Sequence, residues 1–108
     1  MAREVDMDSF AAAWADKAYV LDVREPDEYQ AGHVPGARLA PLSAPAAAMR
    51  GLPDGRPVYV ICASGNRSKT AADRLTAAGA DAYSVAGGTR GWTRTGRPVV
   101  TGLAPGSA

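Results

Sequence analysis

Short apolar runs recur along the chain, separated by segments in which apolar residues return at helical spacing. Two of the runs, residues 18–23 and 58–61, are almost continuously apolar and rich in strand-forming residues. Because a half-exposed strand alternates between apolar and polar residues, the lack of alternation predicts strands buried on both faces, as in a parallel sheet. Shorter runs at residues 37–40 and 82–85 predict two further strands.

The segments between the predicted strands have features of helices. Pro26 and the acids around it are typical of a helix start, and Gly32 can end that helix. Further helices are expected over residues 9–15, with Asp8 or Ser9 as cap, and over residues 43–50, 67–78 and 87–95, with a turn at residues 53–55. The helix over residues 67–78 has an apolar stripe of Ala71, Ala72, Leu75 and Ala78.

Strands that alternate with helices at this spacing predict an α/β fold, in which a parallel sheet has right-handed crossovers and helices on both faces. Ligand sites in such sheets lie beyond the carboxyl ends of the strands. Two polar clusters stand at predicted strand ends, residues 22–24 and residues 62–67. We therefore expect the functional site where these two clusters meet.

The composition is that of one globular domain. The chain has 108 residues, of which 46% are hydrophobic and 21% charged, and its formal net charge is +1. We expect one domain over residues 1–100 and a flexible tail over residues 101–108. So small a net charge predicts no nucleic-acid partner and no anionic membrane surface, although it leaves room for a local basic pocket. No run is long enough for a membrane span.

The single cysteine, Cys62, and the single histidine, His33, restrict the possible chemistry. One cysteine excludes an intramolecular disulfide, and the two residues do not provide the ligand sets of zinc, iron–sulfur or two-histidine metal sites. The first ten residues contain three acids and no apolar run of signal length. We expect a soluble protein of the reducing cytoplasm that binds no metal.

Cys62 follows a predicted buried strand and precedes a predicted helix, in a loop that contains Gly65. Successive N–H groups in such a loop can point inward and hold an anion, and the helix N-terminus and Arg67 add positive charge. These groups predict a lowered pKa for Cys62 and a nucleophilic thiolate. The alternative is a small buried hydrophobic residue at the end of its strand. A thiol sealed inside the core, or one that stays protonated well above neutral pH, would overturn the enzymatic interpretation and leave only the fold.

Three motifs, in order, resemble those of the rhodanese family of sulfurtransferases. They are LDVREPDEYQAGHVPGA at residues 21–37, CASGNRS at residues 62–68 and GGTRGW at residues 87–92. The resemblance is to a single-domain member, without the inactive second copy of tandem rhodaneses. It implies a rhodanese-like three-layer sandwich, in which a five-stranded parallel sheet has helices on both faces.

The resemblance also implies an activity. Cys62 would take a sulfane sulfur from thiosulfate or a similar donor, form a persulfide, and pass the sulfur to cyanide or a thiol acceptor. The acceptor can be a thiol of a partner protein, and no metal or organic cofactor is implied. The loop that would hold the transferred sulfur with its backbone N–H groups consists of Ala63, Ser64, Gly65, Asn66, Arg67 and Ser68.

Two other functions remain open. One is a non-catalytic rhodanese-like module that binds or regulates a protein partner, although the intact Cys62 and its loop argue against it. The other is a small phosphatase or arsenate reductase, since relatives of this fold with those activities carry five residues between cysteine and arginine. Here only four residues separate Cys62 from Arg67. A tetrahedral oxyanion needs more donors around it than one sulfur atom does, so the shorter loop favours sulfur transfer.

Several charged residues are candidates for supporting roles. An unpaired carboxylate at Asp22 would raise the pKa of the thiol, so we expect Asp22 to pair with Arg24 or Arg67. In the family, Asp22 and Arg24 would shape the pocket floor, and a structural role is favoured for both. Glu28 either holds Arg67 or a loop amide, or it is a solvated acid in the first turn of a helix.

The remaining conspicuous residues have simpler interpretations. His33 is expected to brace the turn that follows Gly32, and Trp14 and Trp92 are expected in the core. Arg90 and Arg94 can line the pocket rim and attract an anionic donor.

Overall fold

The computed structural model describes residues 3–44 and 50–106, so most of the helix predicted over residues 43–50 lies outside the described residues. The strands are β1 (Arg3–Val5), β2 (Tyr19–Asp22), β3 (Arg38–Leu39), β4 (Pro57–Ile61) and β5 (Asp81–Val85). The helices are α1 (Met7–Ala15), α2 (Pro26–Ala31), α4 (Asn66–Ala77) and α5 (Gly88–Arg94). No helix in these two stretches is long and apolar enough to cross a membrane.

The strands form a five-stranded parallel sheet in the order β1-β5-β4-β2-β3. The predicted parallel α/β sheet is therefore confirmed. In the register of β2 and β4, Asp22 lies opposite Ile61, so both strands end at the same level. This register places Asp22 beside the start of the cysteine loop, which follows Ile61 directly.

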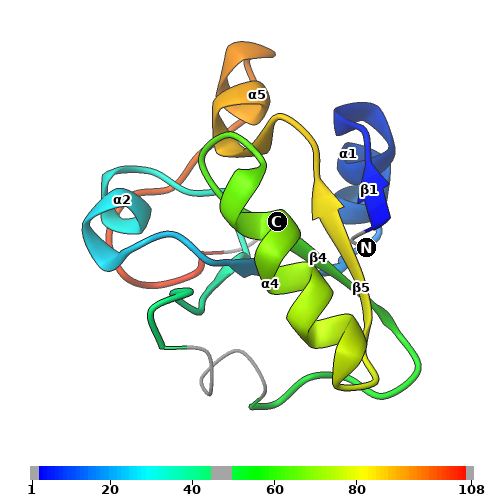
Figure 1. Ribbon diagram of the computed structural model, residues 1–108. Coiled ribbons are helices and arrows are strands. Elements are labelled where there is room, and N and C mark those ends of the chain that lie inside the picture. The colour runs from blue at the N-terminus through cyan, green and yellow to red at the C-terminus, as the bar shows by residue number, and fades with distance from the viewer. Residues whose placement is uncertain (1–2, 45–49, 107–108) are drawn as a thin grey trace.

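Helices cover both faces of the sheet, which gives the predicted three layers (Figure 1). Helix α4 packs on one face through Ala71, Ala72 and Leu75. Helices α1 and α5 pack on the other face, where Phe10 and Trp92 are fully buried and meet edge to face. Both clusters reach β4, whose central position in the sheet buries it on both sides.

Three details of the helices differ from the sequence prediction. Helix α1 begins at Met7, and its cap is Asp6 rather than Asp8 or Ser9, because the Asp6 carboxylate accepts a hydrogen bond from the Ser9 amide at 2.7 Å. Helix α4 begins one residue earlier than predicted, at Asn66. Ala78, predicted in the buried stripe of α4, is exposed, because it follows the last turn of the helix and lies beyond the sheet face.

Strand β1 has no counterpart among the four strands predicted from the apolar pattern. It contains only three residues, Arg-Glu-Val, and forms one edge of the sheet, where it pairs with β5. Two of its residues are exposed, so no apolar run marks it. The family resemblance implied five strands, and β1 is the one that the pattern alone did not predict.

The C-terminal segment lies against the turn that follows α2. Backbone hydrogen bonds of 2.8–2.9 Å join His33 with Val100, Gly102 with Gln30, and Gly36 with Pro105. The His33 ring is fully buried and stacked on Tyr29, with Nε2 3.0 Å from the carbonyl oxygen of Ala104. His33 therefore connects the turn and the segment. Flexibility of residues 101–108 stays a prediction, which amide exchange at Gly102 would test.

Candidate active site

The cysteine loop runs from the end of β4 into α4, at the carboxyl edge of the sheet. Gly65 precedes α4 with φ 110°, a left-handed conformation that glycine adopts without strain. In this conformation its backbone N–H donates to Sγ of Cys62 at 3.1 Å. The loop therefore directs a main-chain donor at the sulfur, as the sequence analysis expected.

A buried pair of serines extends the polar surroundings of the sulfur. Ser68 Oγ lies 3.5 Å from Sγ, 3.1 Å from the Gly65 carbonyl oxygen and 2.7 Å from Ser84 Oγ. The neutral thiol can donate to Ser68. When the thiol is ionised, the Ser68 hydroxyl can instead turn and donate to the sulfur, while Ser84 donates to Ser68. The pair thus offers hydrogen bonds to both protonation states of Cys62.

The electrostatic balance at Cys62 favours the thiolate. Burial raises the pKa of Cys62, since a charged sulfur loses its hydration. Hydrogen bonds from the Ser68 hydroxyl and from the backbone amides of Ser68, Gly65 and Ser64 lower it by more. The net result is a pKa below the ordinary value of a cysteine, which agrees with the predicted activated thiol.

The Cys62 side chain is nevertheless covered in this conformation, with 0% of the residue exposed. This finding runs against a permanently open nucleophile. Cys62 belongs to the hydrophobic cluster under α4, but its sulfur also has two polar neighbours, the Gly65 amide and Ser68 Oγ. Ser64, in the loop that covers the sulfur, is exposed, so this part of the loop faces solvent. A reagent can reach the sulfur only when part of its covering moves.

The start of α5 fixes the loop from the other side. The backbone N–H groups of Thr89 and Arg90 donate to the carbonyl oxygens of Cys62 and Ala63 at 2.8 and 3.0 Å. This approach requires glycine at position 88, where φ is 58° and an added Cβ would lie 2.5 Å from the Cys62 carbonyl oxygen. The GGTRGW motif therefore holds the cysteine loop through backbone contacts.

Arg67 is held by Glu28, one of the two arrangements considered for that acid. The guanidinium and the carboxylate form two parallel hydrogen bonds of 2.7 and 2.8 Å. This bidentate contact is the main reason why the pKa of Glu28 falls to about 2. It joins α2 to the start of α4, since Glu28 and Arg67 lie near the N-terminal ends of those helices.

Asp22 pairs with Arg24, which was one of the two partners expected. Arg24 donates to the Asp22 carboxylate through Nε at 3.0 Å and through its terminal nitrogen at 2.8 Å, and also to the Gly32 carbonyl oxygen. Asp22 is 0% and Arg24 6% exposed. The Asp22 carboxylate is thus paired with the Arg24 guanidinium, and among the described residues no hydrogen bond joins this pair to the Cys62 sulfur.

A hollow of about 410 Å³ lies beside the cysteine loop. Ala63 and Arg90 line it, but Arg94 is not among the lining residues. Thr89 also lines it, and its buried Oγ1 has no hydrogen-bond partner among the described residues. An unsatisfied buried hydroxyl is costly and calls for an explanation. Because Oγ1 is itself covered, a ligand in the hollow can accept from it only if that covering moves aside.

Ser84 and Thr89 were not predicted as functional residues from the sequence. Ser84 is a polar residue in an otherwise apolar part of β5, and that break in the pattern was an available signal. Thr89 had no such signal, because its hydroxyl matters only through its packing against the loop. Among residues 3–44 and 50–106, no group of three or more histidine, cysteine, aspartate or glutamate side chains could hold a metal ion.

Comparison with known proteins places these features in context. The family model of the Rhodanese-like domain matches residues 6–95. The uncharacterized protein YqhL of Bacillus subtilis (strain 168) is 39% identical over 77 residues, which are 70% of this chain and 61% of YqhL, so the chain spans about three fifths of that relative. A crystal structure of a rhodanese-related protein from Thermoplasma volcanium has 32% identity and a TM-score of 0.83, covering 94% of this chain and 99% of that chain. The crystal structure of thiosulfate sulfurtransferase from Pseudomonas aeruginosa has 28% identity and a TM-score of 0.79, covering 94% of this chain but 20% of that chain.

Proposed function

The chain belongs to the family of rhodanese-like domains, and from that premise we propose that it is a sulfurtransferase that carries a sulfane sulfur on Cys62. The observation that supports this most is the hydrogen bond of 3.1 Å from the Gly65 amide to Sγ, in a loop whose donors lower the pKa of the thiol. Such donors stabilise a thiolate, and the same donors suit the terminal sulfur of a persulfide, which is also an anion.

The proposed reaction has two displacement steps. The Cys62 thiolate attacks the outer sulfur of thiosulfate, a sulfur–sulfur bond forms to Cys62, and sulfite leaves with the electron pair of the broken bond. A nucleophile, either cyanide or a thiolate, then attacks the outer sulfur of the persulfide, and the Cys62 thiolate leaves. Atoms and electrons balance without a metal, an organic cofactor or an external oxidant.

The hollow beside the loop suits the anionic end of the donor. The exposed Arg90 can donate to the oxygens of a sulfonate group, and the unpartnered Thr89 hydroxyl can do so once its covering is displaced. Ala63 lies in the same wall and directly follows Cys62, so the attacked sulfur would point toward the cysteine. Because Cys62 is covered, this step also requires a displacement at the loop, and reaction with a bulky alkylating reagent should be slow compared with a free thiol.

The complete burial of Cys62 is also the observation that favours a second candidate function. A rhodanese-like module that only binds a protein partner needs no accessible thiol. The two functions differ in one measurable respect, which is whether the sulfur of Cys62 ever acquires a second sulfur atom.

Mass spectrometry of the protein after incubation with thiosulfate tests the proposal. The expected result is a gain of one sulfur atom on the peptide that contains Cys62, its removal by cyanide with release of thiocyanate, and no gain in Cys62→Ala. Glutathione persulfide serves as a second donor. If neither donor adds sulfur to a protein whose Cys62 still reacts with iodoacetamide, the catalytic proposal is wrong and the binding module takes its place.

A further inference from the structure

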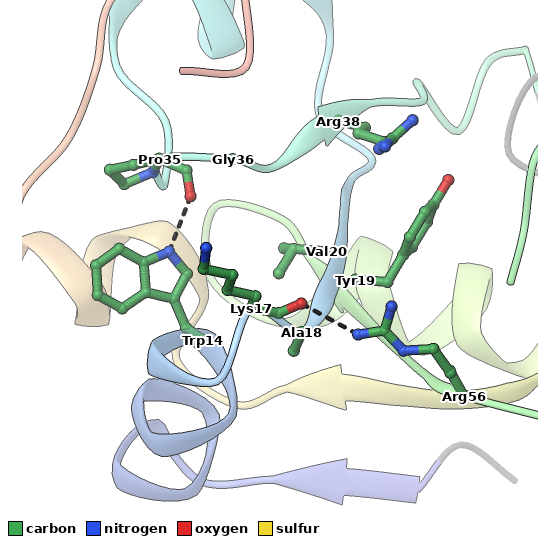
Figure 2. Close-up of a pocket in the computed structure, with 9 residues that line it drawn as sticks. All are labelled: Trp14, Lys17, Ala18, Tyr19, Val20, Pro35, Gly36, Arg38 and Arg56. Atoms are coloured by element: carbon green, nitrogen blue, oxygen red, sulfur yellow. Dashed lines mark hydrogen bonds between the residues drawn. The ribbon is translucent and has the colours of Figure 1, made fainter. Parts of the chain in front are cut away.

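A second hollow lies at the opposite edge of the sheet from Cys62, and we call it the amino-end pocket. It has a volume of about 320 Å³. Its nine lining residues come from the end of α1, the connection to β2, the start of β2, the turn before β3, the first residue of β3 and the residue before β4 (Figure 2): Trp14, Lys17, Ala18, Tyr19, Val20, Pro35, Gly36, Arg38 and Arg56. Because parallel strands all begin at this edge, the pocket is separated from the cysteine loop by the length of β4.

The pocket gathers positive charge without any compensating acid. Lys17, Arg38 and Arg56 line it, and none of the lining residues is acidic. Within residues 3–44 and 50–106, none of the three forms an ion pair. The same is true of Arg50, Arg74, Arg90 and Arg94, but only Lys17, Arg38 and Arg56 line this hollow. In a chain whose net charge is only +1, three unpaired cations around one hollow produce a local field that attracts anions.

The cations belong to a defined arrangement. Arg38 lies over the Tyr19 ring, 5.0 Å from its centroid, and Arg56 donates to the Lys17 carbonyl oxygen at 3.1 Å (Figure 2). Trp14 closes another side by donating its indole N–H to the Pro35 carbonyl oxygen at 2.8 Å. Lys17 by itself is explained by its place just after the carboxyl end of α1, where a cation is favoured. Arg38 and Arg56 come from distant segments and line other sides of the same hollow (Figure 2).

The free polar groups of the pocket indicate the kind of ligand. The ammonium group, the two guanidinium groups and the Tyr19 hydroxyl all offer N–H or O–H donors, and the hydroxyl has no partner among the described residues. No carboxylate in the lining can accept a hydrogen bond from a cationic ligand. A compact oxyanion with two negative charges matches such a set of donors, because guanidinium groups bind phosphate-type oxygens in pairs.

We propose that the amino-end pocket binds a small doubly charged oxyanion of the phosphate type, held by Lys17, Arg38 and Arg56. This site is distinct from the persulfide site and does not depend on the reactivity of Cys62. The shared chemistry covers a phosphate group and a sulfur oxyanion such as sulfate. The pocket is at the small end of the range of ligand sites, which suits an ion or a small monoester rather than a large cofactor.

Backbone-amide chemical shifts of the full chain, followed by NMR during titration, test this proposal. Inorganic phosphate, sulfate and chloride are added at constant ionic strength, so that general screening is equal in all three titrations. Phosphate or sulfate should produce saturable shifts in the millimolar range at residues 17–20 and 36–38. Chloride should not, and the tighter of the two dianions identifies the source of the ligand.

Charge-removing variants sharpen the test. Arg38→Gln and Arg56→Gln should each weaken dianion binding by roughly three- to tenfold, and the double variant should abolish saturation. Arg74→Gln is the matched control, since it removes one exposed charge from α4, away from the pocket. The proposal is overturned if neither dianion gives saturable shift changes, or if the shifts occur only at residues 62–68. It is also overturned if Arg74→Gln weakens binding as much as the pocket variants do. A glutamate-rich peptide that binds the pocket residues while phosphate and sulfate do not would overturn it as well.

Discussion

Replacing Ser68 with alanine removes one of the groups that stabilise the Cys62 thiolate. The Ser68 hydroxyl is the largest of the contributions that lower the pKa of Cys62, and it lies 3.5 Å from Sγ, within the usual range for a hydrogen bond to sulfur. Hydrogen bonds to charged groups contribute roughly 1.5–3 kcal/mol, and because sulfur is a weak acceptor we take the lower limit, about 1.5 kcal/mol. This energy corresponds to about one pKa unit, so the pKa of Cys62 in Ser68→Ala should rise by about that amount.

The rate of alkylation by iodoacetamide, measured as a function of pH, gives the pKa directly. At a pH below both pKa values, the variant holds about tenfold less thiolate than the wild type. Each thiolate is however about threefold more nucleophilic, because nucleophilicity rises with pKa. The variant should therefore react about threefold more slowly at low pH and about threefold faster at high pH. This crossing of the two profiles distinguishes a change in pKa from damage to the site.

Two further variants serve as controls for Ser68→Ala. Ser84→Ala removes the partner of Ser68 but leaves Sγ its own contacts, so the pKa of Cys62 should rise by less. Ser64→Ala removes an exposed hydroxyl from the same loop while keeping the Ser64 amide, and the pKa should stay as in the wild type. The reasoning fails if Ser68→Ala leaves the pKa unchanged or lowers it, or if Ser84→Ala raises it equally.

Three other variants address the supports of the loop. Thr89→Val should raise the KM for thiosulfate and leave kcat unchanged, and Thr89→Ser should restore the KM. Folding stability should not fall in Thr89→Val, because the substitution removes an unsatisfied hydroxyl. Steady-state kinetics and thermal unfolding test this role, and a destabilised Thr89→Val with a normal KM would contradict it. Glu28→Gln should lower the free energy of unfolding by up to about 1 kcal/mol near neutral pH, since the ion pair with Arg67 is one-third exposed. Folding lowers the pKa of Glu28 to about 2, so the stabilisation is complete above the pKa of an unfolded glutamate, near 4.3, and disappears as the pH falls toward 2. If the difference in free energy of unfolding between wild type and Glu28→Gln stays constant over that pH range, the ion pair is not its cause. Gly88→Ala should lower the free energy of unfolding, measured in urea, by at least about 2 kcal/mol, because the added Cβ meets the backbone of the cysteine loop. Gly96→Ala is the control: Gly96 has φ 78° and no atom within 4 Å of the added Cβ, so the loss should be only about 1 kcal/mol. Equal losses in the two variants would show that the close approach at Gly88 is unimportant.

Much of the fold could be predicted because its central strands are buried on both faces. Continuous apolar runs identified β2 and β4, and helical spacing identified α4. The edge strand β1 was not predicted, because two of its three residues are exposed and so short a segment has no apolar run or alternation. The cap of α1 was misplaced because Asp6, Asp8 and Ser9 are all good capping residues, and only the backbone conformation selects Asp6.

The candidate site was predictable where neighbouring positions decide the contacts, and less so where packing decides them. Asp22 ends β2 and Arg24 follows it by two residues, so their pairing could be expected. Arg67 was the other candidate, but it pairs with Glu28. The contact of Ser68 with Ser84 joins α4 to β5, and no local pattern reveals it. The roles of the loop residues in sulfur transfer stay predictions.

The two edges of the sheet have a consequence for association between copies of the chain. Sheets join one another by strand addition at long, flat edges with free backbone donors and acceptors. Here one edge strand has three residues and the other has two, and the first carries Arg3, whose guanidinium is engaged with Asp81. A neighbouring molecule therefore finds only a few unpaired peptide groups to dock against. We expect the domain to resist strand-mediated aggregation at high concentration, although its core strands are among the most β-prone segments in the chain.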